Sequence, residues 1–240
     1  MLLISAAAIL LSTACVNSEN DRPPPLTFDK HVDYIAWYND FVSQGKKDNA
    51  YELYQDLNAI VQGRGGFPKL EDPANEQLEN AFKHTWKRKD CPDLAAYLKE
   101  FAPYLKTFKK AVKRRDYWQP APADTKVLCA LVLPNLASSR ACSKATLAQA
   151  LMKQDAQSEA VIDACRVVLQ NADHMQQSGN LIGVLVGRAE RALVYSVASA
   201  ALAEGVIDGQ DITSLYTTMQ RHDSAPPDPR RWLALEWATT

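Results

Sequence analysis

The chain has 240 residues, of which 47% are hydrophobic and 23% are charged, and its formal net charge is −1. This composition is that of an ordinary globular protein, and the length is sufficient to bury a sizeable core. Only 9 glycines, together with long alanine- and leucine-rich periodic stretches, argue against a turn-rich β fold. We therefore expect an all-α fold of stacked antiparallel helical hairpins, with an irregular tetratricopeptide-like array as one form of it.

The N-terminal segment has the features of an export signal. Residues 1–14 are apolar and end in small residues, which is typical of a signal peptide and its cleavage site. Cys15 follows directly, and Leu11-Ser12-Thr13-Ala14-Cys15 resembles the bacterial lipobox, in which cleavage leaves an N-terminal cysteine that receives lipid. The resemblance implies a membrane-anchored lipoprotein of the cell envelope with Cys15 as the lipid attachment site. Plain secretion to the periplasm is the alternative.

Residues 15–26 predict a flexible tether, because they are polar and contain Pro23-Pro24-Pro25. Residues 27–118 then predict an N-terminal helical region. Apolar residues recur there with helical spacing over Asp29–Gln44, Asn49–Val61, Asn75–Lys87, Cys91–Phe101 and Pro103–Arg115.

Residues 119–126 are rich in proline and alanine and predict a linker. The C-terminal helical region, residues 127–240, follows. It contains a short apolar run at 127–133, a helix from Pro134 to Lys153, a helix after Asp208 or Asp211, and a last apolar-faced segment at 230–238.

The C-terminal region is built on a helical hairpin at residues 156–205. Its first arm is amphipathic, whereas its second arm, from Asn180, is apolar nearly all round and therefore predicts a buried helix. Gly183 and Gly187 predict that a neighbouring backbone approaches the helix closely. Gly205 predicts the end of the helix. A membrane span is the alternative, but Arg188, Glu190 and Arg191 interrupt the apolar run.

These three charged residues must be paired or lie at an interface if the helix is buried. An arginine of another helix, such as Arg140 or Arg166, is a suitable partner for Glu190. A structural ion pair is the simpler interpretation, and a pocket for polar ligands is the other.

Four cysteines follow Cys15. In an exported chain an even number permits disulfides, and Cys142 and Cys165 form the preferred candidate pair because they lie at similar distances from a hairpin corner. Buried free thiols that pack as small hydrophobic groups are the alternative.

No catalytic residues, cofactor site or metal site can be assigned. The four histidines (His31, His84, His174 and His222) are far apart and are expected on the surface, and no cysteine–histidine spacing predicts zinc. Ser43-Gln44-Gly45-Lys46 matches a serine nucleophile pattern by chance, because its companion motifs are absent.

The uneven distribution of charge along the chain suggests a function. Residues 83–115 hold eleven lysines and arginines against three acidic residues. We therefore expect Lys106, Lys109, Lys110, Lys113 and Arg114 to form a patch for an anionic surface, such as lipid head groups or a cell-wall polymer. Lysines that simply solvate helix exteriors are the alternative, and export argues against nucleic acid as a partner.

Several short motifs resemble a group of uncharacterised, exported bacterial helical proteins. They are Val32-Asp33-Tyr34-Ile35-Ala36-Trp37-Tyr38, Asp48-Asn49-Ala50-Tyr51-Glu52-Leu53-Tyr54, residues 111–114, Leu133-Pro134-Asn135-Leu136, Asn180-Leu181-Ile182-Gly183 and Leu185-Val186-Gly187. The chain departs from the group at Arg188 and Glu190, where apolar residues are expected. The resemblance implies an exported helical fold and no particular activity.

Two functions remain as hypotheses. The first is a non-enzymatic scaffold, anchored in the envelope, that binds a protein or an anionic envelope polymer. The second is an envelope hydrolase of cell-wall material whose site is assembled from scattered residues.

Overall fold

The computed structural model describes residues 33–122, 135–152, 158–178 and 181–223. The chain divides before Tyr34 into two units, and every helix described below belongs to the second, residues 34–240. Cys15, the signal peptide, the tether and the segments 127–133 and 230–238 lie outside the described residues.

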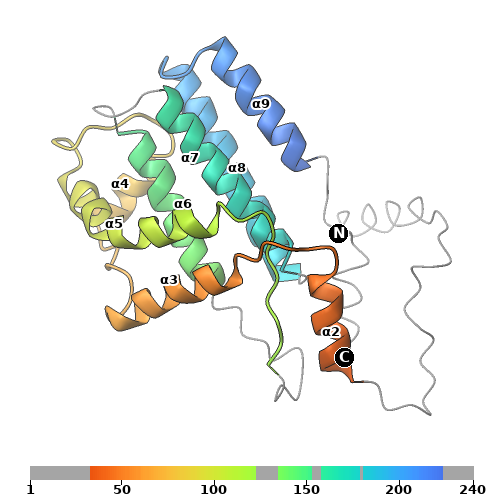
Figure 1. Ribbon diagram of the computed structural model, residues 1–240. Coiled ribbons are helices and arrows are strands. Elements are labelled where there is room, and N and C mark those ends of the chain that lie inside the picture. The colour runs from red at the N-terminus through yellow and green to blue at the C-terminus, as the bar shows by residue number, and fades with distance from the viewer. Residues whose placement is uncertain (1–32, 123–134, 153–157, 179–180, 224–240) are drawn as a thin grey trace, which may run out of the picture. The chain divides into compact units, whose positions relative to one another are not determined.

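The second unit is built from helices, which Figure 1 shows in chain order. They are α2 (Tyr34–Ser43), α3 (Tyr51–Gly63), α4 (Ala74–Asn80), α5 (Pro92–Ala111), α6 (Asn135–Ala150), α7 (Ser158–Gln176), α8 (Leu181–Ala203) and α9 (Gly209–Asp223). Within the described ranges the only β pairings are two isolated bridges. The predicted all-α fold is confirmed.

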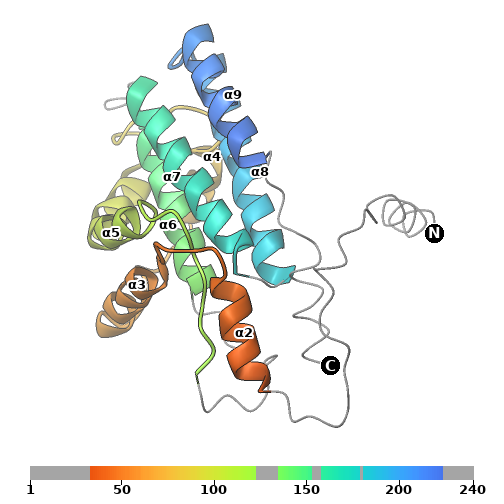
Figure 2. The same ribbon diagram turned by 45° about the vertical axis from the view of Figure 1, so that its right-hand side comes forward.

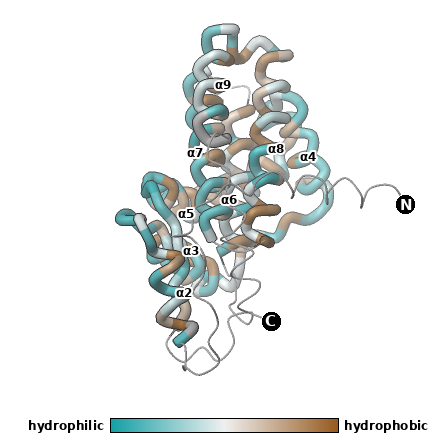
Figure 3. The backbone as a smooth tube through the Cα atoms, turned by 90° about the vertical axis from the view of Figure 1, so that its right-hand side faces the viewer, coloured by the Kyte–Doolittle hydropathy of each residue, from teal (hydrophilic) through white to brown (hydrophobic). Residues whose placement is uncertain are grey.

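One core connects the helices before and after the predicted linker. Its buried side chains include Tyr54 of α3, Phe101 and Phe108 of α5, Leu147 of α6 and Val168 of α7. Figure 3 shows hydrophilic residues along the outer turns of α3 and α5. The apolar stripes of these helices thus face a common interior, as their helical spacing requires.

The predicted linker, residues 119–126, is described as far as residue 122. Gln119 and Ala121 are buried there, and Ala121 exchanges two hydrogen bonds with the Asn39 side chain of α2. Tyr38 of α2 donates a hydrogen bond to the Gln119 carbonyl. The first part of this segment therefore packs against α2.

Helix α5 is one helix, whereas the sequence predicted two that meet near Pro103. Pro103 lies inside the helix on its exposed side. A proline removes one helical hydrogen bond, and water can satisfy the carbonyl that loses its partner on an exposed face. The apolar stripe on both sides of Pro103 packs against the same core, and this burial outweighs the local loss.

Helix α4 is shorter than predicted and ends at Asn80 rather than at Lys87. Trp86 is buried, and its indole nitrogen donates a hydrogen bond to the carbonyl of Ala148 at 2.7 Å. The Trp86 backbone nitrogen donates to Leu151 at the end of α6. The chain leaves the helix because this contact satisfies both the ring and the backbone of Trp86.

Helices α7 and α8 pack closely, as the two glycines predicted. A Cβ atom at Gly187 would lie 2.5 Å from the carbonyl oxygen of Ala172, and one at Gly183 would meet Ser178 and the carbonyl of Met175. Both glycines are buried. The side of α8 that faces α7 therefore depends on the absence of side chains at these two positions.

The predicted burial of α8 on all sides is wrong. Leu181, Ile182, Leu185, Tyr195 and Leu202 are exposed on it. No helix of the described residues is long and apolar enough to cross a membrane.

The charged residues of α8 differ from one another in their exposure and in their partners. Arg188 is exposed, Arg191 pairs with Asp173 of α7, and only Glu190 is fully buried. Glu190 accepts a hydrogen bond from Asn171, and the charge of Arg140 also lowers its pKa. Arg166 instead pairs with Asp163.

The expected disulfide is not formed in the structure. Cys142 of α6 and Cys165 of α7 are both free and buried, which agrees with the alternative of buried thiols. Burial raises the pKa of the Cys142 thiol, and it raises the pKa of Cys165 to about 12. Both groups are therefore protonated and unreactive at neutral pH.

The corner between α8 and α9 is closed by local hydrogen bonds. Gly205 has a φ of 68°, and the backbone nitrogens of Gly205 and Val206 donate to Leu202 and Ala201. This pattern is a Schellman motif. Asp208 then caps α9, because its carboxylate accepts from the backbone nitrogens of residues 210 and 211.

We expect Asp208→Ala to lower the free energy of unfolding by about 1 kcal/mol, because two backbone donors at the start of α9 lose their acceptor. Chemical denaturation measures this change. Asp208→Asn keeps an acceptor oxygen and serves as the control, with an expected loss of less than about 0.5 kcal/mol. Equal losses in the two variants would contradict the capping role.

Candidate functional site

The basic patch lies on the outer side of α5 and in the turn that follows it. Lys106, Lys109, Lys110 and Lys113 are all exposed, and so is Arg114. Positions 106, 110 and 113 are spaced by four and three residues, so they share one face of the helix, and position 109 borders that face. All five residues that the sequence assigned to the patch are thus exposed, and the four lysines lie on neighbouring positions along the chain.

Buried residues on the opposite side of α5 hold this face outward. Leu105, Phe108 and Val112 are buried in the core between the lysines. Lys109 and Lys110 also lie in the last turn of the helix, where positive charge is favourable because of the helix dipole. The alternation of buried apolar and exposed lysine residues thus fixes the patch by ordinary amphipathic packing.

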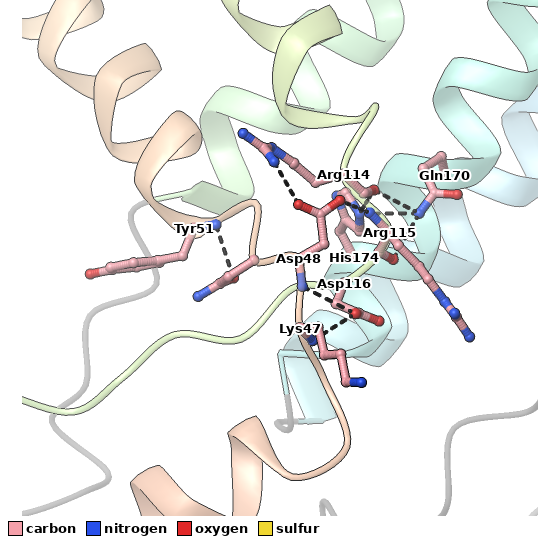
Figure 4. Close-up of polar contacts among 9 residues, drawn as sticks. Lys47, Asp48, Tyr51, Arg114, Arg115, Asp116, Gln170 and His174 are labelled. Atoms are coloured by element: carbon pink, nitrogen blue, oxygen red, sulfur yellow. Dashed lines mark hydrogen bonds and ion pairs between the residues drawn. The ribbon is translucent and has the colours of Figure 1, made fainter.

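The patch ends at a junction between three segments, which Figure 4 shows in detail. The guanidinium of Arg114 donates to Asp48 Oδ1 at 2.6 Å, and the backbone nitrogen of Arg115 donates to Oδ2 of the same carboxylate. The Arg114 hydrogen bond is the main cause that lowers the pKa of Asp48. Asp48 therefore neutralises part of the charge at this end of the patch.

Asp116 stabilises the same junction through hydrogen bonds to residues 47, 48 and 50. Its carboxylate accepts from the backbone nitrogen of Lys47 at 3.1 Å, and its backbone pairs with residues 48 and 50. Asn49 and Asp116 thereby form one of the isolated parallel bridges. Two short segments that are far apart in the sequence are thus joined where α5 ends and α3 begins.

His174 connects this junction to the interior, and its expected surface position is wrong. The ring is fully buried, and its Nε2 lies 2.9 Å from the carbonyl oxygen of Arg114. A carbonyl only accepts, so Nε2 carries a hydrogen. Gln170, one turn earlier on α7, donates to the carbonyls of Arg114 and Arg115. His84, in contrast, is exposed as predicted.

The other ring nitrogen of His174 begins a buried polar chain. Nδ1 lies 3.0 Å from the Tyr54 hydroxyl, which lies 2.6 Å from Oδ1 of Asn171. The Asn171 amide nitrogen then donates to Glu190 Oε2 at 2.6 Å and to the hydroxyl of Ser143. We call His174, Tyr54, Asn171 and Glu190 the buried relay, which joins α3, α7 and α8.

The relay is withdrawn from solvent, and this decides its protonation. Glu190 is 4% exposed, and burial is the main cause that raises its pKa to about 7, although the Asn171 amide, the Ser143 hydroxyl and the charge of Arg140 lower it. Burial is also the main cause that lowers the pKa of His174 to about 4. At neutral pH His174 is therefore neutral, and Glu190 holds its proton to a higher pH than an exposed glutamate does.

A second buried polar cluster lies between α3 and α6. Asn135 Oδ1 accepts from the Asn58 amide at 2.6 Å, and Ser138 donates to Asn58 Oδ1. The Asn135 amide donates to the Tyr117 hydroxyl. These groups satisfy one another, so they fix how the two helices face each other rather than offering a site for a ligand.

The sequence missed both buried clusters. The only signal for the relay was that Asn171 and His174 occupy positions of α7 spaced like its apolar residues. Across the described ranges, no group of three or more histidine, cysteine or acidic residues is arranged to hold a metal ion. Comparison of the chain with protein-family models, curated proteins and solved structures finds no match.

Proposed function

We propose that the chain is a non-enzymatic helical binding protein of the bacterial cell envelope, and that α5 holds an anionic envelope polymer. The observation that carries this proposal is the exposure of Lys106, Lys109 and Lys110 on α5 and of Lys113 in the turn that follows it. Lysine ammonium groups on flexible stems suit repeated phosphate or carboxylate groups, because they act as adaptable point charges.

The distribution of charge supports this partner. The whole chain has a formal charge of −1, so the eleven basic residues of segment 83–115 are a local concentration and not a general property. A local positive field attracts a polyanion by summed interactions even where each contact is weak. The export features of residues 1–26 favour an envelope polymer over nucleic acid. A lipid at Cys15 would keep the patch near that polymer.

The alternative of an envelope hydrolase has less support. A hydrolase needs polar groups that a substrate can reach, with an acid and a base in suitable positions. His174 and Glu190 are titratable groups at the two ends of the buried relay, but both are buried. The exposed Asp48 is occupied by Arg114.

We expect Lys106→Gln, Lys110→Gln and Lys113→Gln, combined in one variant, to weaken binding to a soluble poly(glycerol phosphate) about tenfold. Exposed charge contacts contribute about 0.5 kcal/mol each, and three of them sum to about 1.5 kcal/mol, close to the 1.4 kcal/mol that corresponds to a factor of ten. Isothermal titration calorimetry at low salt measures the affinity. Every protein compared in this experiment also carries Cys15→Ser, so that no lipid can be attached.

The matched control is the variant Arg64→Gln, Lys69→Gln and Arg166→Gln. These three basic residues are also exposed but lie outside segment 83–115, and the change in net charge is the same. We expect this control to lose less than threefold, and binding by the wild type to weaken as salt is added. No binding by the wild type, or equal losses in the two variants, would contradict the proposed function.

A further inference from the structure

The His174 end of the buried relay has more hydrogen-bond contacts than hydrogens to fill them. The Tyr54 hydroxyl donates to Oδ1 of Asn171 at 2.6 Å, and its oxygen lies 3.0 Å from Nδ1 of His174. Nε2 of His174 lies 2.9 Å from the carbonyl oxygen of Arg114. A tyrosine and a neutral imidazole supply one hydrogen each for these three contacts. With the ring hydrogen on Nε2, no hydrogen lies between Nδ1 and the Tyr54 oxygen.

A second hydrogen on the His174 ring would fill the third contact, but the interior opposes it. The ring is fully buried, and burial is the main cause that lowers its pKa to about 4. The charged groups around the ring are Asp48, Asp116 and Asp173, which favour the imidazolium, and Lys46, which opposes it. Burial outweighs the three carboxylates, so the ring is neutral at neutral pH and one contact stays empty.

An ionised Glu190 decides which contact is empty. Its Oε2 accepts from the Asn171 amide nitrogen at 2.6 Å, so the amide oxygen faces the Tyr54 hydroxyl and accepts from it. The Tyr54 oxygen then needs a donor, and Nδ1 of His174 is placed to provide it. In a neutral ring Nε2 then has no hydrogen, and it presents a lone pair to the Arg114 carbonyl.

Gln170 supports this arrangement of the ring. Its amide nitrogen lies 3.1 Å from Nε2 of His174, and this contact is a hydrogen bond only when Nε2 carries no hydrogen. The same amide nitrogen lies 3.2 Å from the Arg115 carbonyl oxygen. An amide nitrogen has two hydrogens, so Gln170 can donate to the ring and to a carbonyl at once.

A protonated Glu190 reverses the direction of the relay. The carboxyl hydrogen needs an acceptor, and a half turn of the Asn171 amide supplies one, because it exchanges the amide oxygen and nitrogen. The amide nitrogen then donates to the Tyr54 oxygen, and the Tyr54 hydroxyl donates to Nδ1 of His174. Nε2 keeps the ring hydrogen and donates it to the Arg114 carbonyl. Each of the four contacts from Glu190 to Arg114 now holds one hydrogen.

We propose that the proton on Glu190 sets the tautomer of His174: a protonated Glu190 places the ring hydrogen on Nε2, and an ionised Glu190 places it on Nδ1 and removes the buried donor from the Arg114 carbonyl. The carboxyl hydrogen passes to the solvent in this change. The numbers of hydrogens on Asn171, Tyr54 and His174 stay the same, so no other reactant is needed.

The surroundings of Glu190 place this switch near neutral pH. Burial raises its pKa to about 7, and Oε1 is buried with no hydrogen-bond partner in the described part of the chain. The titratable groups around it are Arg140 and Cys142 of α6, Tyr54 of α3, and Arg191, which pairs with Asp173 of α7. Arg140 favours the ionised form. Burial raises the pKa of the Cys142 thiol and of the Tyr54 hydroxyl, so both stay neutral.

The switch acts on the junction at the end of the basic patch. When Nε2 has no hydrogen, the Arg114 carbonyl keeps the amide of Gln170 as a donor, at 3.4 Å. The loss of the shorter bond from His174 weakens the hold of α7 on the turn after α5. This inference is independent of the proposed function, because it uses no contact with a polymer.

The ring nitrogens of His174 report the tautomer directly in long-range proton–nitrogen NMR spectra of protein labelled with ¹⁵N and ¹³C. We expect the hydrogen on Nε2 at about pH 5.5 and on Nδ1 at about pH 8.5, so that the two nitrogens exchange their chemical shifts. The midpoint should coincide with the titration of the Glu190 side-chain carbon. Every protein is full length, without a histidine tag, and carries Cys15→Ser, His31→Gln, His84→Gln and His222→Gln, so that His174 is the source of every ring signal.

Three variants separate the relay from local effects on the ring. Glu190→Gln has no proton to lose, so its tautomer should be the same over the whole pH range. Tyr54→Phe removes the hydroxyl that joins the ring to Asn171, so its tautomer should no longer follow Glu190. Glu159→Gln is the matched control, since it changes an exposed glutamate of α7 and should leave the wild-type exchange of shifts intact.

Four results would overturn the proposal. The first is one tautomer throughout the pH range, whether or not Glu190 titrates in it. The second is a ring with hydrogens on both nitrogens beside an ionised Glu190. The third is an exchange of shifts that persists in Glu190→Gln, and the fourth is one that persists unchanged in Tyr54→Phe.

Discussion

Replacement of Gly187 by alanine is expected to lower the free energy of unfolding by about 2 kcal/mol. The new methyl carbon would lie 2.5 Å from the carbonyl oxygen of Ala172 and 2.7 Å from Cγ of Gln176. A backbone carbonyl cannot rotate away, so α7 and α8 must separate, and forced overpacking costs roughly 1–3 kcal/mol. The better helix propensity of alanine offsets only about 1 kcal/mol at most.

Gly63→Ala is the matched control for this prediction. Gly63 also lies in a helix, but a Cβ atom there has no neighbour within 4 Å. We expect a change within about 0.5 kcal/mol of the wild type, measured by denaturant unfolding. Similar losses in both variants would show that the spacing of α7 and α8 is not set by the contact at Gly187.

The second large effect concerns pH. Because the pKa of Glu190 is raised from 4.5 to about 7, the folded protein binds more protons than the unfolded chain between these pH values. The Glu190 contribution to stability therefore falls as pH rises through this window, by about 3 kcal/mol in total. We expect Glu190→Gln to remove this fall, so its stability relative to the wild type should rise by about 3 kcal/mol from pH 4 to pH 8.

The titration of His174 changes the stability in the opposite direction, both in the wild type and in Glu190→Gln. Its pKa is lowered from 6.5 to about 4, so the folded protein binds fewer protons than the unfolded chain between these values. Its contribution therefore rises with pH, and it nearly cancels that of Glu190 in the wild type between pH 4.5 and 6.5. Glu190→Gln should reveal the His174 contribution as a steeper rise of stability in this range.

Denaturant unfolding at several pH values measures both curves. Glu159→Gln, which changes an exposed glutamate of α7, is the control for the loss of a carboxylate outside the core. A Glu190→Gln curve that runs parallel to the wild-type curve would show that Glu190 titrates as it does in the unfolded chain.

The helices could be predicted because their signal is local. Apolar residues recur with helical spacing over α2, α3, α7 and α9, and caps such as Gly205 and Asp208 act within a few residues. The exposure of the lysines in the basic patch could also be predicted from the sequence, since lysines that alternate with apolar residues along a helix are a local pattern. The end of α4 could not be predicted, because it depends on the contact of Trp86 with Ala148, 62 residues later.

The buried relay could not be predicted for the same reason. Tyr54 and Asn171 are 117 residues apart, and nothing in either segment indicates the other. The exposure of large apolar side chains on α8 was not predicted, for a different reason. Alanine and serine occur both inside and outside a fold, so a helix rich in alanine, leucine and valine reads as buried on every side. Its three charged residues were a better guide, because they divide between one exposed, one paired and one buried position.

The two free thiols between α6 and α7 bear on whether the packing of these helices requires an oxidant. Cys142 and Cys165 are reduced and lie among apolar side chains. Their contribution to stability is that of ordinary small hydrophobic groups, and it does not require an oxidant. The packing of this hairpin therefore does not depend on the formation of a disulfide between them.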